Sequence, residues 1–177
     1  MISVIIPHWP LPGTEEALEK CLESIHGQYD EINVVVNFGE GFAKACNKGL
    51  RSASGDYLFV INNDTQLIDG ELKDMAFEDA VTFPKIQGKD NRFPDCFICI
   101  PRWIYEKVGG YDERFEGGYF EDDDLIRRWN CAAIPFRRID HVVINHLHGG
   151  GLTMKQIGES KYMKINKEKY QQKWANI

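Results

Sequence analysis

The sequence lacks the features that would place it in several large classes of protein. No apolar run approaches the roughly 18 to 20 residues that span a bilayer, and the first residues, Met1 to Pro7, carry no basic side chain of the kind that begins an export signal. Basic residues are outnumbered, with 21 Lys and Arg against 27 Asp and Glu and a net charge of −6, which disfavours nucleic-acid binding. We therefore expect a soluble cytoplasmic protein with no nucleic-acid partner. To bind an anionic ligand, such a protein would need a local positive charge, for example a bound cation.

A disulfide framework is also missing. The five cysteines are odd in number and scattered along the chain, a pattern that fits a reducing compartment. Cys96 and Cys99 have the CxxC spacing of redox and zinc sites, but no second CxxC pair accompanies them and their segment resembles a strand. Buried, unreactive thiols are the favoured interpretation, and a redox or zinc site is the alternative.

What is present fits one globular α/β domain. The chain has 177 residues, 43% of them apolar and 27% charged, which suits a single core. In its first third, strand-like and helix-like patterns alternate, and this predicts a mostly parallel sheet with helices on both faces. The expected strands are residues 3–7, 32–36, 57–61, 81–83, 96–100 and 142–144, and the expected helices are residues 14–25, 42–53, 103–108, 122–131 and 156–177.

Polar residues cluster where three of these segments end or begin. Asn62-Asn63-Asp64 follows a strand, an acidic run from Glu121 to Asp124 precedes a helix, and His146 and His148 end the last strand. Ligands of open α/β sheets bind beyond the carboxyl ends of the strands, so we expect these clusters to converge. A carboxylate, a histidine and substrate phosphates could hold Mg²⁺ or Mn²⁺. The alternative for Asn62-Asn63-Asp64 is an ordinary turn.

Helical spacing separates the members of the acidic run. Asp123 and Asp124 each precede an arginine by four residues, which predicts ion pairs on a solvated face. Asp122 instead shares a face with Ile126 and Trp129. It is either a favourable charge at a helix start or a desolvated general base, and spacing leaves both open.

The histidines allow two interpretations as well. His146 and His148 alternate along a strand, so they point the same way, next to three consecutive glycines. A metal site and a structural role are equally compatible with this pattern. His8 and Trp9, just past the first strand, lie at the expected ligand edge, where an aromatic ring can stack on a base.

Five segments of the sequence form an ordered set: residues 3–7 (SVIIP), 41–50 (GFAKACNKGL), 55–65 (GDYLFVINNDT), 108–115 (VGGYDERF) and 120–125 (FEDDDL). Together they resemble the inverting family-2 glycosyltransferases of the GT-A fold, and the resemblance runs nearly end to end. The resemblance implies transfer of a sugar from a nucleoside diphosphate (UDP, dTDP or GDP) to a hydroxyl of a glycan or lipid-linked glycan. It also implies a requirement for Mn²⁺ or Mg²⁺.

The same resemblance suggests roles for individual residues. Asn62-Asn63-Asp64 stands in place of the DxD motif, with Asp64 on the metal, while Asp122 matches the family's general base and His146 or His148 its late histidine. We expect the donor to be bound by Pro7, His8, Trp9, Asn37, Lys44, Asn62 and Asn63, with an ordinary surface position as the alternative for Lys44. Residues 1–65 would be the nucleotide-binding half, residues 66–154 the acceptor and catalytic half, and residues 155–177 a helical tail.

One departure from the family pattern bears on specificity. A strand and a helix that usually precede the Gly-Phe-Ala segment are absent between Asn37 and Gly41, so base recognition is not implied. A non-catalytic nucleotide-sugar or carbohydrate-binding relative and a sugar nucleotidyltransferase are the alternatives to a transferase. The lysine-rich tail is either a solvated helix face or a peripheral membrane contact.

Overall fold

Seven strands form one sheet in the order β2-β1-β3-β6-β5-β7-β4 in the computed structural model, which describes residues 1–88, 96–147, 156 and 159–175. The strands are β1 (Ile2–His8), β2 (Glu31–Val36), β3 (Tyr57–Ile61), β4 (Thr65–Asp69), β5 (Val81–Ile86), β6 (Phe97–Pro101) and β7 (Phe136–His146). The helices are α1 (Thr14–Ser24), α2 (Phe42–Ser52), the 3₁₀ turn η1 (Leu72–Met75), α3 (Arg102–Val108), α4 (Glu121–Cys131) and α6 (Glu159–Trp174).

The sheet has two parts that differ in strand direction. β2, β1 and β3 are parallel neighbours, as the alternating pattern predicts, whereas β6 runs antiparallel to both β3 and β5, and β4 runs antiparallel to β7. β5 and β7 are again parallel. The predicted α/β fold is confirmed, and the second half of the sheet combines parallel and antiparallel strand pairs.

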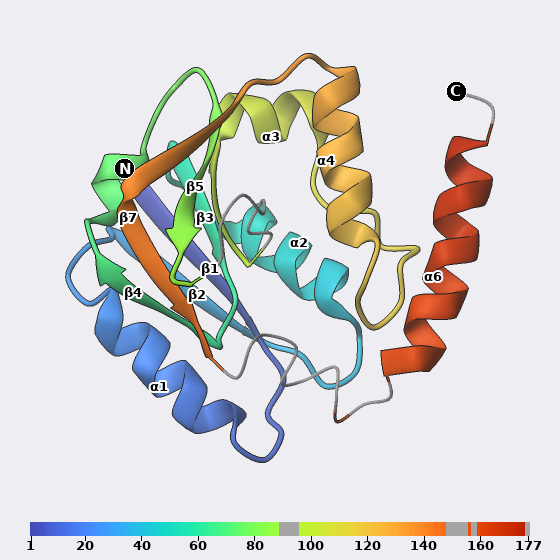
Figure 1. The fold of residues 1–177 in the computed structure, drawn as a ribbon, viewed down its shortest axis with the longest axis horizontal. Helices are drawn as coiled ribbons and strands as arrows, with labels where there is room; N and C mark the ends of the chain where they lie inside the picture. The colour runs from blue at the N-terminus through green and yellow to red at the C-terminus, as the bar shows by residue number, and fades with distance from the viewer. Residues whose placement is uncertain (89–95, 148–155, 157–158, 176–177) are drawn as a thin grey trace.

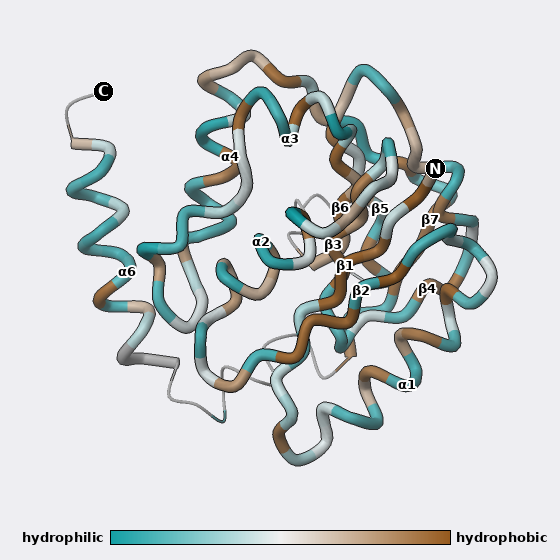
Figure 2. Tube along the Cα trace, turned by 180° about the vertical axis from the view of Figure 1, so that it is seen from behind, coloured by the Kyte–Doolittle hydropathy of each residue, from teal (hydrophilic) through white to brown (hydrophobic). Residues whose placement is uncertain are grey.

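Helices cover both faces of the sheet (Figure 1). One apolar cluster joins the sheet to α2, α3 and α4, and its largest buried side chain is Trp129. The other joins it to α1 and η1 through residues such as Cys21 and Leu72. The most hydrophobic stretches run along β1, β3 and β6 at the centre of the sheet (Figure 2), so burial on both faces fixes these strands.

Helix α6 stands beside α4, on the side of the molecule away from α1 (Figure 1). The apolar side chains expected on one of its faces, Tyr162, Ile165, Tyr170 and Trp174, are all half-buried or buried. The prediction of an amphipathic helix is therefore confirmed for its described side chains. Among the described residues no helix is both long and apolar enough to cross a bilayer.

Two strands differ from their prediction. β4 begins directly after Asp64, where the sequence indicates only a turn, and it pairs with the end of β7. β7 spans 11 residues although only 142–144 read as a strand, because charged side chains such as Arg138 and Asp140, which pair at 2.6 Å, interrupt the apolar pattern.

The cysteines give a direct test of the core. All five are free, four are buried and Cys131 is exposed, so buried thiols are confirmed for Cys96 and Cys99. Burial raises the pKa of Cys21 to about 12 and also raises those of Cys46 and Cys99, because a buried thiolate loses its hydration. We expect iodoacetamide at pH 8 to modify Cys131 alone in the folded protein, as counted by mass spectrometry. A second adduct before unfolding would contradict the described burial.

Candidate functional site

The carboxyl ends of the parallel strands gather the first polar residues of the site. His8 ends β1 and lies opposite Val36, the last residue of β2, while Ile61 ends β3 on the other side of β1 and leads into Asn62. At the far side, His146 ends β7 in register with Thr65 of β4. Strand pairing therefore brings His146 beside Asp64, which is 82 positions away in sequence.

Asp64 and His146 are in direct contact. The Nε2 atom of His146 lies 3.1 Å from Oδ1 of Asp64, and their side chains are only 13% and 7% exposed. The Leu147 amide also donates to the Asp64 carbonyl at 2.7 Å, which fixes the two segments together. The expected convergence of this carboxylate with a late histidine is thus present, while His148 lies outside the described residues.

A second buried contact supports the turn before Asp64. Asn63 Nδ2 donates to Nδ1 of His8 at 2.8 Å, so that nitrogen is an acceptor and the proton is assigned to Nε2. His8 Nε2 lies 3.1 Å from a carboxylate oxygen of Glu15 in α1. Both ring nitrogens of His8, a residue only 3% exposed, are thus occupied by protein, and its side chain holds the Asn63 turn in place.

The other expected donor-binding residues near this edge differ in whether their polar atoms are free to bind a ligand. Asn62 Oδ1 is buried and has no hydrogen-bond partner in the described part of the chain, so it can accept from a ligand hydroxyl. Asn37 Oδ1 accepts from the Gly39 and Glu40 amides at 3.1 and 2.7 Å and shapes the loop after β2. Pro7 is buried within β1, whereas Trp9 is half-buried and lies against Gly39.

Lys44 belongs to a different neighbourhood. It is exposed on α2, and its charge acts on Glu113, whose pKa is lowered mainly by hydrogen bonds from Asn47 and Arg51 and in smaller part by Lys44. Arg51 pairs with the same carboxylate at 3.0 Å. The structure therefore associates Lys44 and Arg51 with Glu113, and a contact of Lys44 with a donor remains a prediction.

Asp122 occupies the first turn of α4, near enough to α2 for its charge to act on Cys46. It is half-buried, and the Asp122 and Glu121 carboxylates, after the larger effect of burial, raise the pKa of the Cys46 thiol in α2. Four acidic residues fill this first turn, where the helix dipole stabilises negative charge. Asp122 is thus a partly desolvated carboxylate at the margin of the buried face, while Glu121 is the more deeply buried of the two.

The prediction that Asp124 lies on a solvated face is wrong. Asp124 does pair with Arg128 at 2.9 Å, but its side chain is fully buried. It also accepts from Lys173 at 2.6 Å and from Trp174 Nε1 at 2.9 Å. The four-residue spacing predicts the pair correctly, but it cannot show that α6 covers it. Arg127, expected to pair with Asp123, instead stacks 4.4 Å above the Trp174 ring.

The loop before α4 has an unusual backbone. Tyr119 and Phe120 both have left-handed φ values, 76° and 72°, which cost bulky residues about 1–3 kcal/mol each. Asn166 of α6 contacts this loop, and Asp112 at its start has a lowered pKa because Arg114 and then Lys173 donate hydrogen bonds to it. Sequence patterns gave no signal for Asn166, which lies among charged and polar neighbours.

The chemistry of Asp64 and His146 fits a divalent cation. Adjacent ligands of an octahedral ion with bonds of about 2.1 Å lie about 3 Å apart, and the Asp64–His146 separation is 3.1 Å. No cluster of three or more His, Cys, Asp or Glu side chains suited to a metal occurs among the described residues. Two protein ligands suit Mg²⁺ or Mn²⁺, since these ions take much of their coordination from phosphates and water.

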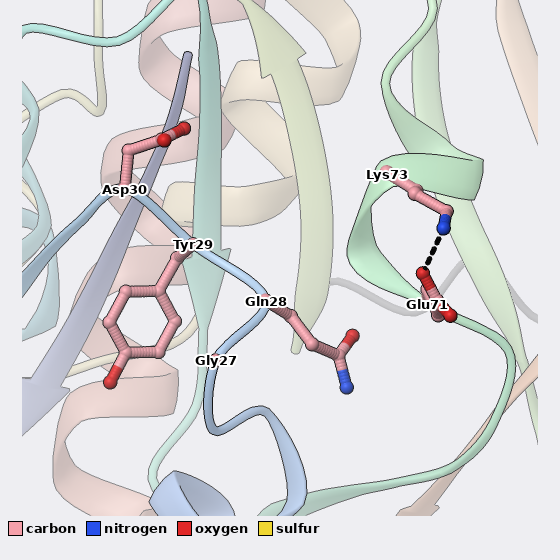
Figure 3. Close-up of a pocket in the computed structure, with 6 residues that line it drawn as sticks. All are labelled: Gly27, Gln28, Tyr29, Asp30, Glu71 and Lys73. Atoms are coloured by element: carbon pink, nitrogen blue, oxygen red, sulfur yellow. Dashed lines mark ion pairs between the residues drawn. The ribbon is translucent and has the colours of Figure 1, made fainter.

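A pocket elsewhere on the molecule does not belong to this site. It is lined by Gly27, Gln28, Tyr29, Asp30, Glu71 and Lys73 (Figure 3). Asp30 accepts from the Ile2 amide at the start of β1, so the pocket lies near the amino ends of the parallel strands. Ligands of this sheet class bind at the opposite edge, and the pocket's Lys73 is already paired with Glu71 (Figure 3).

Comparison with protein families and solved structures agrees with the fold. Residues 12–79 match the family described as glycosyl transferase family 2, a segment that contains Asn62 to Asp64 but stops before α4 and β7. No curated protein matches the sequence. Similar solved structures are nevertheless numerous, and those described next are glycosyltransferases.

Three of these structures show the extent of the likeness. The catalytic domain of Drosophila β1,4-galactosyltransferase 7 in complex with xylobiose is 18% identical with a TM-score of 0.65, over 83% of this chain and 70% of that one. A mutant of that enzyme with manganese, UDP-Gal and xylobiose is 16% identical with a TM-score of 0.63, over 88% and 78%. GalNAc-T7 with UDP, GalNAc and Mn²⁺ is 12% identical with a TM-score of 0.67, over 84% and 43%.

Proposed function

We propose that this chain, a glycosyltransferase of the GT-A fold with a family 2 segment at residues 12–79, transfers a sugar from a nucleoside diphosphate to a glycan or lipid-linked hydroxyl with inversion. Residues 1–65 would bind the donor and residues 66–154 would form the acceptor and catalytic half. The neighbours that hold UDP-Gal, manganese and xylobiose, or UDP, GalNAc and Mn²⁺, support this class of partner.

The observation that carries the proposal is the Asp64–His146 contact. It joins a carboxylate and an imidazole within 3.1 Å, nearly buried, at the sheet edge where nucleotide ligands of α/β folds bind. An acidic protein has few ways to hold a diphosphate, and a cation on this pair supplies one. Asn62 Oδ1, buried and without a partner in the described chain, adds an acceptor for a ribose or sugar hydroxyl.

A divalent ion held by Asp64 and His146 would act as a Lewis acid on the departing diphosphate. The protein supplies the remaining chemistry. Asp122 takes the proton of the acceptor hydroxyl as that oxygen bonds to the anomeric carbon. The bond between this carbon and the diphosphate oxygen breaks at the same time, and its electron pair stays on the diphosphate. Attack opposite the leaving group inverts the anomeric configuration.

Half-burial of Asp122 suits this role. A carboxylate at the margin of a buried face is partly shielded from water and keeps access to an acceptor hydroxyl, as a general base needs. The charge of Asp122 acts on Cys46 of α2. The first residue of that helix, Phe42, follows the loop after β2. The proposal includes lipid-linked glycans among the acceptors. It also includes a cytoplasmic location, peripheral to a membrane if the acceptor is lipid-linked.

Donor turnover tests the proposed function without a known acceptor. UDP-, dTDP- and GDP-sugars are incubated with the protein and Mn²⁺, Mg²⁺ or EDTA, and released nucleoside diphosphate is measured. We expect release with at least one donor, by slow transfer to water, that EDTA abolishes and added Mn²⁺ or Mg²⁺ restores.

Two results would favour the alternatives. Metal-dependent nucleotide binding in calorimetry with no release from any donor would indicate a non-catalytic binding relative. Formation of a nucleoside triphosphate when pyrophosphate is supplied would indicate a sugar nucleotidyltransferase, because that enzyme breaks the bond between the two phosphates. Either result would contradict a transferase.

A further inference from the structure

Helix α6 makes its polar contacts with the segment that leads into α4. Its side chains bond to residues of the 112–119 loop and to Asp124 in the first turn of α4. In both views it lies next to α4, on the opposite side of that helix from the sheet (Figures 1 and 2). Asp122, the proposed base, sits between these two groups of contacts.

Asn166 makes the densest set of these contacts. It is fully buried, and its Nδ2 atom donates to the Glu116, Gly118 and Tyr119 carbonyls at 2.8, 2.9 and 3.0 Å. Its Oδ1 atom accepts from the Glu116 amide at 3.1 Å. One side chain therefore contacts four backbone groups of a single loop, with its two amide hydrogens shared among three carbonyls, as no apolar residue could.

This loop needs an external hold because of its conformation. Tyr119 and Phe120 are left-handed, a region that bulky L-residues rarely adopt and that persists where surrounding contacts determine it. Phe120 is the N-cap residue directly before α4, so the direction in which Asp122 points depends on these two residues. Tyr162 of α6 also packs against Gly117, where a Cβ atom would lie 2.6 Å from its ring.

The same loop reaches the donor half. The Gly117 carbonyl accepts from the Phe42 amide at 2.8 Å, and a Cβ on Gly41 would lie 3.1 Å from the Gly117 nitrogen. On the other side of Asp122, Lys173 and Trp174 bond to the Asp124 carboxylate at 2.6 and 2.9 Å. Helix α6 thus bonds to the backbone before the proposed base and to the Asp124 side chain after it.

We propose that α6 is a clamp that positions Asp122 for proton transfer, with Asn166 as its main positioning residue. This inference rests on the proposed function and adds to it a residue outside the 12–79 family segment. Asn166 acts through the Tyr119–Phe120 backbone and does not contact the substrates.

The test is Asn166→Ala, measured by kcat for nucleoside diphosphate release and by the calorimetric affinity for Mn²⁺ and nucleoside diphosphate. We expect kcat to fall about 10- to 100-fold, the cost of a small misplacement of a catalytic group, while the affinity stays within about twofold. Lys167→Ala, at an exposed neighbour, is the matched control and should change neither quantity.

A double-mutant cycle separates positioning from general destabilisation. If Asn166 acts through Asp122, then Asn166→Ala should have little further effect on kcat in the Asp122→Asn protein, because residues that act as a unit are not additive. A purely structural role would lower kcat by the same factor in both backgrounds, and that result would overturn the inference.

A surface variant keeps the test open if Asn166→Ala fails to fold. Lys169, 30% exposed, donates to the Arg114 carbonyl and to Glu116 at 2.7 Å each, and Lys169→Ala should lower kcat about threefold or more at unchanged affinity. Wild-type kcat in Lys169→Ala, or in a folded Asn166→Ala protein, would overturn the clamp alone. An inactive wild-type protein would overturn the proposed function and the clamp with it.

Discussion

Replacing Asp122 by Asn is expected to lower the rate of sugar transfer about 100- to 10 000-fold, the range that general base catalysis contributes. The amide keeps the shape of the side chain but cannot take a proton from the acceptor hydroxyl. In the proposed function the metal and donor bind through other residues, Asp64 and His146. Their calorimetric affinity should therefore stay within about twofold of wild type.

Asp123→Asn is the matched control for this variant. Asp123 is the next residue of α4 and is exposed. Its replacement by Asn removes the same charge from the same helix turn. It should keep wild-type kcat. Near wild-type transfer by Asp122→Asn, or an equal loss in Asp123→Asn, would show that another group is the base, and the buried Glu121 would be the next candidate.

Replacing Asp64 by Asn is expected to weaken Mn²⁺-dependent nucleotide binding by about 100-fold or more, since the loss of even a supporting group costs 10- to 100-fold in metal affinity. The amide oxygen is neutral, so it offsets none of the charge of the cation. Titration of Mn²⁺ by electron paramagnetic resonance in the presence of UDP, dTDP or GDP measures this affinity. Turnover should fall in parallel.

Asp69→Asn controls for the loss of one negative charge from the same strand. Asp69 is exposed at the far end of β4 and should bind Mn²⁺ as the wild type does. If Asp64→Asn binds Mn²⁺ and nucleotide normally, the metal assignment is wrong even where the fold and the family are right.

The half of the site near the parallel strands could be predicted from sequence because strand ends are local features. Asp64 comes shortly after a strongly apolar strand, and His146 ends a later strand. Ligands of α/β sheets bind beyond the carboxyl ends of strands, and this rule predicts that both residues lie at the ligand-binding edge. The contact between Asp64 and His146 depends on β4, a strand that the sequence does not indicate. The predicted convergence is still correct, because both residues lie at the same edge of the sheet.

The half near α4 could not be predicted in the same way. Spacing identified the Asp124–Arg128 pair, but its burial results from α6, whose contacts span 50 positions of sequence. No sequence pattern predicts the burial of Asn166, since a polar residue in a lysine-rich helix is normally solvated. Tertiary packing of a terminal helix decided both cases, and such packing leaves little trace in local periodicity.

The most direct test of the central claim is the anomalous scattering of Mn²⁺ in a crystal grown with a nucleoside diphosphate. The account predicts one strong peak within bonding distance of the Asp64 carboxylate and His146 Nε2, with the diphosphate on the same ion and the sugar side open toward Asp122. A nucleotide bound with its metal elsewhere, or bound without metal at this edge, would contradict it.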